Sequence, residues 1–436
     1  MGALDISIVG PAIPSIEEKL LVEPRLLGWI FSIYVLFNLT GVSLFARLSD
    51  IFGRRNIYMV SLGIFALGSL IVSTSKTFDM LLIGRAVQGF GASGIFPVAS
   101  AVVGDIFPPE KRGRVLGLIG AVFGLAFLIG PIIAGILLNF FEWTVLFLIN
   151  IPIAIVLILV SIRNIPQTRV ETSGLFDWKG ILSMGLMLAA FTFGINHIDA
   201  ADFAGSLQSA RVFPFLLGAL IFMIATFLIE KQAENPIIKL SYFRIRLIVV
   251  AGAIAVATGI LQSSFVFIPN FAVGAFQIEA SEASFMLVPL VMATAIGSPL
   301  FGRLIDLYGS KLIILIGLIL SAAGFYLLHL SFESKWLFYT SGVLIGLGLS
   351  VLSGSSLRYI MLNETSLVDR AVTQGMLTIF ISLGQLTGAS LIGVIIANKE
   401  GTVGYENVFL YQSLFLILII SSAFLLKNRR SELQAQ

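Results

Sequence analysis

The decapeptide A-R-L-S-D-I-F-G-R-R occupies residues 46–55, and a closely related decapeptide, G-R-L-I-D-L-Y-G-S-K, occupies residues 302–311. Both contain a small residue, Arg, Leu, a carboxylate, an aromatic ring, glycine and a final base in the same order, at a spacing of 256 residues. Further matches, 258 residues apart, pair Arg112 with Arg370, Gly130 with Gly388 and Gly135 with Gly393. The chain therefore consists of two similar halves in parallel order.

The composition indicates that these halves lie in a membrane. Of the 436 residues, 57% are apolar and only 12% are charged, and the mean hydropathy is +1.00. Soluble proteins carry about 25% charged residues, so this chain has too little charge to coat a soluble body. It contains no cysteine and only two histidines, so we expect no disulfide, no metal site and no cofactor. A net charge of +3 gives no indication of nucleic acid as a partner.

Hydropathy predicts how often the chain crosses the bilayer, because each crossing helix needs about 20 mostly apolar residues. Windows of that length predict thirteen full spans and a shorter first span near residues 3–17. If the chain starts inside, 20 of its 27 Lys and Arg residues fall in inside segments, and such an excess marks the cytoplasmic side. We expect an all-α, multi-pass protein of the cell (inner) membrane with both termini cytoplasmic, and we expect its first span to be truncated.

The repeat and the spans together predict the organisation of the chain. We expect a six-helix bundle over residues 1–165, two inserted transmembrane helices over 166–240, a second six-helix bundle over 241–427 and a cytoplasmic tail over 428–436. Parallel halves of six spans, with a substrate path between them, are typical of transporters. The alternative is a duplicated bundle with a purely structural role.

Several motifs give these spans a family resemblance. The loop at residues 46–55 resembles the signature loop of the major facilitator superfamily, with Ala46 in place of its first glycine. The other motifs are Leu82–Ala92, Gly130–Gly135, Leu4–Pro14, Phe147–Pro152, and Pro269–Phe271 followed by Pro289. In this order, the motifs resemble the fourteen-span drug/proton antiporter branch of that superfamily, the multidrug efflux type. The resemblance implies a fold of two six-helix bundles plus two extra helices.

The resemblance also implies a conformational latch at the cytoplasmic side. Asp50 would contact the start of a helix in the other half, near residues 369–374, where the helix dipole favours a carboxylate by about 0.3–1 kcal/mol. A contact made in only one of two states biases the protein toward that state. The residues that we assign to this latch are Asp50, Gly53, Arg54, Arg55, Asp306 and Gly309. The alternative is a basic anchor that only fixes the topology.

Two charged residues in predicted spans, Asp5 and Arg85, are candidates for proton coupling. Burying an arginine in a membrane costs about 2.5–3.5 kcal/mol on insertion scales, so such a residue usually has a partner or faces water. The resemblance implies that Asp5 gains and loses the coupled proton. The alternatives are that Arg85 extends outward to the membrane surface, and that Asp5 is solvated at the inner surface if Met1 is the natural start.

Small and polar residues in other spans suggest further sites. Gly130, Pro131 and Gly135 resemble the antiporter motif, and glycines four apart in the same span predict a tight, kinked interface at the seam of the two halves. The residues of the candidate substrate cavity are Gln88, Gln262, Phe267, Asn270 and Gln374. The alternative for both sets is ordinary helix packing and hydrogen bonding within the bundle.

We therefore expect a secondary active transporter that exports lipophilic, drug-like molecules in exchange for protons by alternating access. Its partners would be a small-molecule substrate, protons and the lipid bilayer; a periplasmic adaptor is left open. The chain has no Walker A sequence, which argues against ATP as the energy source. It has no HExxH or GxSxG motif, which argues against an enzyme. The alternatives are a permease for one metabolite and a non-transporting membrane sensor.

Overall fold

The computed structural model describes residues 1–22, 27, 29–167, 178–199, 202–233, 236, 240–278, 280–397, 399 and 401–429. Within these ranges the regular structure is helical throughout, and no strand is present. A helix satisfies all of its backbone hydrogen bonds internally, which is the requirement for crossing the hydrocarbon of a bilayer. The all-α prediction is confirmed.

The first half consists of seven helices in the described part of the chain. They are α1 (Gly2–Leu20), α2 (Trp29–Phe52), α3 (Arg54–Ser73), α4 (Phe78–Ile106), α5 (Pro109–Leu138), α6 (Thr144–Leu148) and α7 (Asn150–Asn164). Local chemistry explains several of these limits. Thr77 caps α4 by accepting a hydrogen bond from the backbone of Met80, and Pro109 stands at the first position of α5, where a missing N–H costs nothing.

The middle segment and the second half follow the same plan with more short elements. The middle helices are α8 (Trp178–Asn196), α9 (Phe203–Gln208) and α10 (Phe213–Gln232). The second half contains η2 (Leu240–Arg244), α11 (Arg246–Ser263), η3 (Ser264–Val266), α12 (Ile268–Phe276), α13 (Ala280–Phe285), α14 (Val288–Tyr308), α15 (Ser310–His329), η4 (Ser331–Glu333), α16 (Lys335–Leu349), η5 (Ser350–Ser355), α17 (Ser356–Asn363), η6 (Leu367–Asp369), α18 (Arg370–Ala397) and α19 (Val403–Ala423).

Twelve helical segments of the described chain are long and apolar enough to cross a membrane. Three of them join consecutive elements, so that α6 with α7, α11 with α12, and α16 with α17 each form one segment. The remaining two predicted spans correspond to α1, which is apolar over Gly2–Ile13, and to α5, which is 30 residues long. The prediction of fourteen spans with a short first one is confirmed.

The repeat in the sequence is also a repeat in the backbone. Gly53 separates α2 from α3 with φ 92°, and Gly309 separates α14 from α15 with φ 86°. Only glycine adopts such angles without strain, which explains why both decapeptides carry it at the same place. We call the end of the molecule where these two turns lie the loop end.

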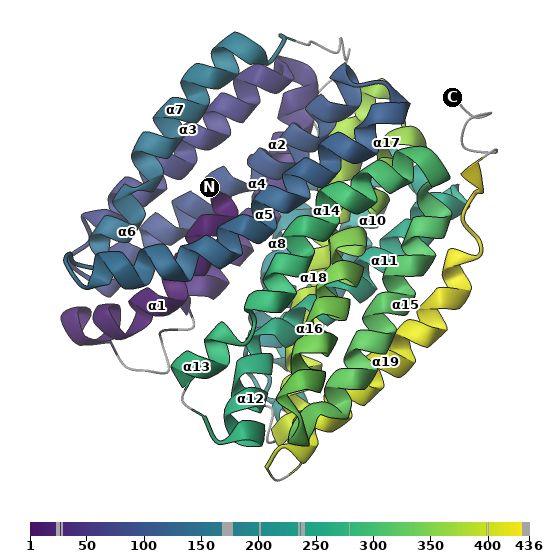
Figure 1. Ribbon diagram of the computed structural model, residues 1–436. Helices are drawn as coiled ribbons and strands as arrows, with labels where there is room; N and C mark the ends of the chain where they lie inside the picture. The colour runs from purple at the N-terminus through teal and green to yellow at the C-terminus, as the bar shows by residue number, and fades with distance from the viewer. Residues whose placement is uncertain are drawn as a thin grey trace.

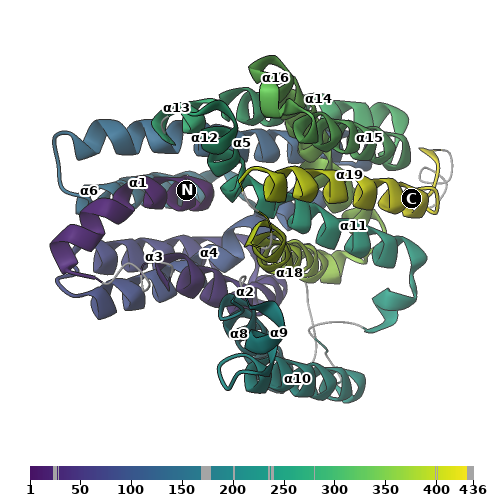
Figure 2. The ribbon, with the colours of Figure 1, turned by 90° about the horizontal axis from the view of Figure 1, so that it is seen from below.

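The helices gather into two bundles (Figures 1 and 2). Helices α1–α7 form one bundle and α11–α19 the other, while α8 packs against α10, α2 and α18 at the side. The bundles meet where α5 crosses α14. There, a Cβ atom on Gly113 would collide with the backbone of Gly302, and one on Gly117 would collide with the backbone of Ser298. Small residues therefore let two backbones touch at the seam.

The expected domain limits lie close to parts of the chain that the structure does not describe. The limit at residue 165 precedes the undescribed stretch 168–177, and the limit at residue 240 follows residues 237–239. The tail over 428–436 is described only as far as residue 429. At the other end of the chain, Met1 packs against Tyr34, Phe65 and Ala92 in the interior of the first bundle.

Candidate functional site

A buried ion pair lies inside the first bundle. Asp5 is on α1 and Arg85 is on α4, and both side chains are 0% exposed. Nη1 of Arg85 donates to Oδ2 of Asp5 at 2.6 Å. The two residues that the sequence singled out for proton coupling are thus direct partners. Because Arg85 is enclosed, it does not extend to the membrane surface.

Three amide and hydroxyl side chains complete the surroundings of this carboxylate. Nε2 of Gln88 donates to Oδ1 of Asp5 and to Oγ of Ser69, both at 2.7 Å, and Nδ2 of Asn150 donates to Oδ1 of Asp5 at 3.1 Å. Nη1 of Arg85 also donates to Oε1 of Gln88 at 2.6 Å. Gln88, expected in a substrate cavity, instead belongs to this cluster.

Two aromatic rings enclose the guanidinium of Arg85. Its Cζ atom lies 4.4 Å from the ring centre of Tyr34 and 5.9 Å from that of Phe147, and its Nε donates to the carbonyl of Ile30 at 3.2 Å. The ion pair therefore has no net charge and is buried away from solvent. Removing either charge would leave the other one buried without compensation, so the cluster is sensitive to the protonation of Asp5.

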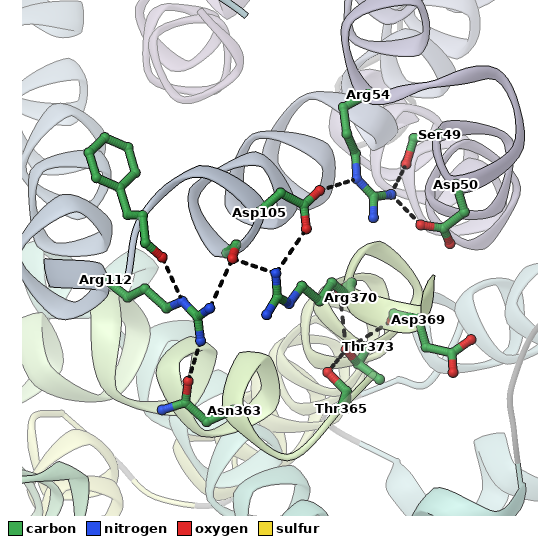
Figure 3. Close-up of polar contacts among 12 residues, drawn as sticks. Ser49, Asp50, Arg54, Asp105, Arg112, Asn363, Thr365, Asp369, Arg370 and Thr373 are labelled. Carbon is green, nitrogen blue, oxygen red and sulfur yellow. Dashed lines mark hydrogen bonds and ion pairs between the residues drawn. The ribbon is translucent and has the colours of Figure 1, made fainter. Parts of the chain in front are cut away.

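A second polar network lies at the loop end (Figure 3). Arg54, the first residue of α3, donates to the carboxylate of Asp50, to Oγ of Ser49 at 2.9 Å and to Oδ2 of Asp105 at 2.9 Å. The turn at Gly53 brings Arg54 back over the end of α2, which makes these contacts possible. Sequence reasoning missed Asp105, although it lies one turn before Pro108, at the end of a predicted span.

No hydrogen bond joins Asp50 to the start of α18 among the described residues, although α2 packs against that helix. Oδ1 of Asp50 accepts a hydrogen bond from Arg54, and its Oδ2 has no hydrogen-bond partner among the described residues. The reason is electrostatic. Arg54 carries a full charge four residues away, whereas the first turn of a helix offers only about half a charge.

The matching residue of the second half does make that kind of contact. Oδ1 of Asp306 accepts from the backbone N–H of Gly113, and Oδ2 accepts from that of Arg114, both at 2.9 Å. These N–H groups belong to the first turns of α5, in the other bundle. Asp306 therefore joins the two bundles through a helix N-terminus, while Gly309 supplies the turn that follows it.

Two arginines matched in the repeat join the bundles crosswise. Arg370 of α18 donates to Oδ1 of Asp105 at 3.1 Å and to the carbonyl of Gly104. Arg112 of α5 donates to the same carbonyl at 3.0 Å and to Oδ1 of Asn363 at 2.6 Å. Asp105 and Asn363 are themselves 258 residues apart, so the two contacts are counterparts. Figure 3 shows both arginines converging on the end of α4.

Other residues assigned from the sequence lie away from the seam. Arg55 donates to the carbonyl of Ile162 and to Gln167, both within the first half. A Cβ on Gly130 would collide with Ser7 of α1, and Gly135 has open space beside it. The side chain of Pro131 lies outside the described part. The tight interface that the glycines of this span predict at the seam is present at Gly113 and Gly117, whereas Gly130 and Gly135 lie toward the opposite end of α5.

The remaining members of the expected cavity are dispersed in the second bundle. Oε1 of Gln262 accepts from Nε2 of Gln385 at 2.7 Å, Asn270 is exposed, and Phe267 packs at the edge of the second-half core. Gln374 is buried beside Arg358. These residues therefore do not gather around Gln88. Among the residues that the structure describes, no group of three His, Asp or Glu side chains is placed to hold a metal ion.

Sequence reasoning assigned Arg358 to no site, because it counted this residue among the bases at the cytoplasmic end of a predicted span. The structure continues the helix beyond it to Asn363, so Arg358 lies inside the segment Lys335–Asn363 and is only 4% exposed. Its guanidinium lies 4.0 Å from the ring centre of Phe96 on α4. A segment of the second half therefore also contains a buried base.

Comparisons with known proteins agree with this architecture. The family model of the Major Facilitator Superfamily matches this chain twice, over residues 1–267 and over residues 250–436. The uncharacterized MFS-type transporter YfiU of Bacillus subtilis (strain 168) is 30% identical over 413 residues, which are 94% of this chain and 79% of that protein. Multidrug resistance protein 3 of the same organism is 28% identical over 405 residues, covering 91% and 77%.

A solved structure shares the fold at low sequence identity. The crystal structure of the human organic anion transporter MFSD10 (TETRAN) superimposes with a TM-score of 0.73 at 16% identity, covering 97% of this chain and 96% of that one. At this level of identity the likeness concerns the fold alone. Together with the family match over both halves, it leads to one conclusion: the chain is a multi-pass membrane protein that belongs to the Major Facilitator Superfamily of transporters.

Proposed function

We propose that the protein exports lipophilic small molecules from the cell in exchange for protons. The observation that carries the proposal is the fully buried ion pair between Asp5 and Arg85, held by Gln88 and Asn150 inside the first bundle. Ionisable residues inside a membrane are costly and mark functional sites such as proton relays. The multidrug names of two curated relatives supply the substrate class as an analogy.

The chemistry of the pair explains how a proton would drive the transport cycle. Protonation of Asp5 removes the negative charge and leaves Arg85 as a buried cation without a counter-charge. That state is strained, so the helices that carry the two residues, α1 and α4, rearrange to relieve it. Release of the proton on the other side of the membrane restores the pair and resets the transporter.

Alternating access would use the contacts at the loop end. We place this end, both termini and the two basic turns in the cytoplasm of a cell whose inner membrane holds the protein, following the excess of Lys and Arg there. The bonds of Asp306 to α5 and of Arg370 to Asp105 would then hold the cytoplasmic side closed in this state. The two bundles, with limits near residues 165 and 241, would separate there to admit substrate.

Transport into inverted membrane vesicles tests the proposal, with a panel of lipophilic dyes that includes anions, neutral molecules and cations as probes. We expect uptake that requires a proton gradient, stops when nigericin collapses that gradient, and is lost in Asp5→Asn. Asp79→Asn is the matched control, since Asp79 is an exposed carboxylate near the start of α4. Uptake of the panel that persists without any gradient would refute proton coupling.

A further inference from the structure

Arg358 differs from three other buried arginines in its lack of a carboxylate partner; Arg112, which is also buried, has no carboxylate either but donates to three carbonyl or amide oxygens. Arg54, Arg85 and Arg370 each form an ion pair with an aspartate. Arg358, by contrast, forms no ion pair with any described residue, and its Nε has no hydrogen-bond partner. Among the described residues, its Nη1 donates to Oε1 of Gln374 at 3.2 Å, and its backbone carbonyl accepts from Nε2 of Gln374 at 3.1 Å. A guanidinium is thus buried between the two bundles without a carboxylate partner among the described residues.

The guanidinium points toward the middle of the spans. Side chains on a helix lean toward its N-terminus, and both α4 and α17 run toward the loop end. Leu362 of α17 faces Gly104 of α4, whereas Arg358, one turn earlier, reaches Phe96. From Phe96 to Gly104 the helix α4 rises by about 12 Å, whereas from Arg358 to Leu362 the helix α17 rises by only about 6 Å. The guanidinium of Arg358 therefore lies about 6 Å farther from the loop end than its own backbone.

Neighbouring polar groups are also without partners. The hydroxyl of Ser100, one turn from Phe96 on the same face of α4, is buried with no hydrogen bond. So is the hydroxyl of Ser355, one turn before Arg358. Ser355 ends the π-helical segment η5, and such segments are frequent at functional sites. The site therefore presents one unused guanidinium N–H and two unpaired hydroxyls, whereas buried polar groups are normally paired.

We propose that Arg358, Phe96 and Gln374 form a binding site for the carboxylate of a lipophilic organic anion. An ionised carboxylate is an acceptor-only group that can take up the free Nε–H and a second guanidinium N–H at once. Phe96 supplies the apolar platform for the rest of the molecule. Phe96 belongs to one bundle and the other two residues to the second, so the anion is held between the halves that move.

This inference rests on the proposed export function and narrows its substrate class. Asp5 and Arg85 neutralise each other and serve the proton, so they leave no charge for a substrate. Arg358, by contrast, is a buried charge that no described carboxylate neutralises. In the present state it is covered by the contacts at the loop end, and separation of the bundles there would open it to anions from the cytoplasm.

Binding to the purified full-length protein tests the site with two probes that differ only in charge, 1-pyrenebutyrate and 1-pyrenebutyramide. We expect the wild type to bind the carboxylate at least about tenfold more tightly than the amide, as one charge-assisted bidentate contact allows. Arg358→Gln should abolish this preference without changing the affinity for the amide. Arg211→Gln, which removes an exposed arginine before α10, should leave the preference intact.

Two further variants keep the test decisive if Arg358→Gln does not fold. Arg358→Lys retains the charge but loses the planar fork, so it should reduce the preference about threefold. Phe96→Leu retains the guanidinium but loses the platform, so it should weaken the binding of both probes about threefold and leave the preference intact. Equal binding of both probes to the wild type, an unchanged preference in a folded Arg358 variant, or unchanged affinities in Phe96→Leu overturns the site. If the preference is present but proteoliposomes transport neither probe under a proton gradient, the export function fails and the site stands.

Discussion

The two signature loops have the same backbone and different partners. In the first, Asp50 bonds to Arg54 of its own half; in the second, Asp306 bonds to the start of α5 in the opposite half. The residue that matches Arg54 in the second loop is Ser310, which brings no charge to the carboxylate. A single substitution between repeats thus decides whether the aspartate acts within a bundle or between bundles.

The interiors of the two halves differ in the same way. The first bundle encloses Asp5 and Arg85, whereas a shift of Arg85 by 256 or 258 residues falls on Ser341 or Val343. The second bundle instead encloses Arg358, which has no described carboxylate partner, near the seam. Duplication preserved the helices and their turns, and the charges diverged, which allows one half to handle a proton and the other to handle substrate.

The largest expected effect comes from breaking the ion pair of the first bundle. Arg85→Gln leaves the carboxylate of Asp5 buried without a counter-charge, so stability should fall by about 3–5 kcal/mol and transport should stop. Thermal unfolding in detergent and dye uptake measure the two effects. The double variant Asp5→Asn with Arg85→Gln should recover most of the stability but not the coupling. A single variant as stable as the double one would contradict this account.

The second-largest effect should come from weakening the contacts that Arg370 and Arg112 make between the two bundles. Asp105→Asn weakens charge-assisted bonds to Arg54 and Arg370, at a cost of about 1.5–3 kcal/mol to the closed state. The reciprocal variant Asn363→Asp should strengthen the contact of Arg112. The chain has no cysteine, so a thiol introduced as Ala371→Cys, buried at the seam, reports opening. Its labelling rate should rise in the first variant and fall in the second; equal rates would refute the role in closure.

A smaller effect should follow from exchanging the loops. Arg54→Ser makes the first loop resemble the second and frees Asp50 to approach the start of α18, which sits close to α2. We expect turnover to slow by about threefold, because a second contact of the Asp306 kind, worth about 0.3–1 kcal/mol, then holds the closed state. The control is Arg55→Ser, whose partners lie within the first half. Turnover unchanged in Arg54→Ser but slowed in Arg55→Ser would reverse the assignment.

The smallest effect is expected for Asp306→Asn. The amide can still accept one backbone hydrogen bond from Gly113 but loses the interaction of its charge with the helix dipole, about 0.3–1 kcal/mol. Opening at the loop end should become slightly faster, as judged by thiol labelling at Ala371→Cys, while Asp50→Asn should disturb only the contacts of Arg54. Identical effects of the two substitutions would show that the loops are equivalent after all.

Much of the fold follows from the sequence, because a membrane imposes a simple rule on helix length and polarity. Fourteen segments, the parallel repeat and the glycine turns are all visible in the residues. The pairing of Asp5 with Arg85 was within reach because both are charges in apolar spans. The same reasoning missed Arg358, since a hydropathy window that ends at a charge cannot detect that α17 carries the helix onward to Asn363.

The partners at the loop end were harder to predict. The helix dipole made the start of α18 an attractive partner for Asp50, but the outcome depends on competition with a nearby full charge, and the backbone angle at Gly53 decides it. Gly130 was assigned to the seam because its helix does reach the seam, although at the other end. Which end of a helix crosses its neighbour is a property of the packed molecule.

The crossing of α5 and α14 has a mechanical consequence. Gly113, Gly117 and Gly302 bring bare backbone against bare backbone, while Leu116 and Phe301 pack beside them. At the glycines no side-chain ridge stands between the two helices, so a small shift of one helix along the other meets less resistance there. Gly117→Ala tests the idea, since it should impede the cycle while each lobe keeps its melting temperature, and free cycling would reject it. The close backbone contact at this crossing would then be the place where the two bundles move against each other.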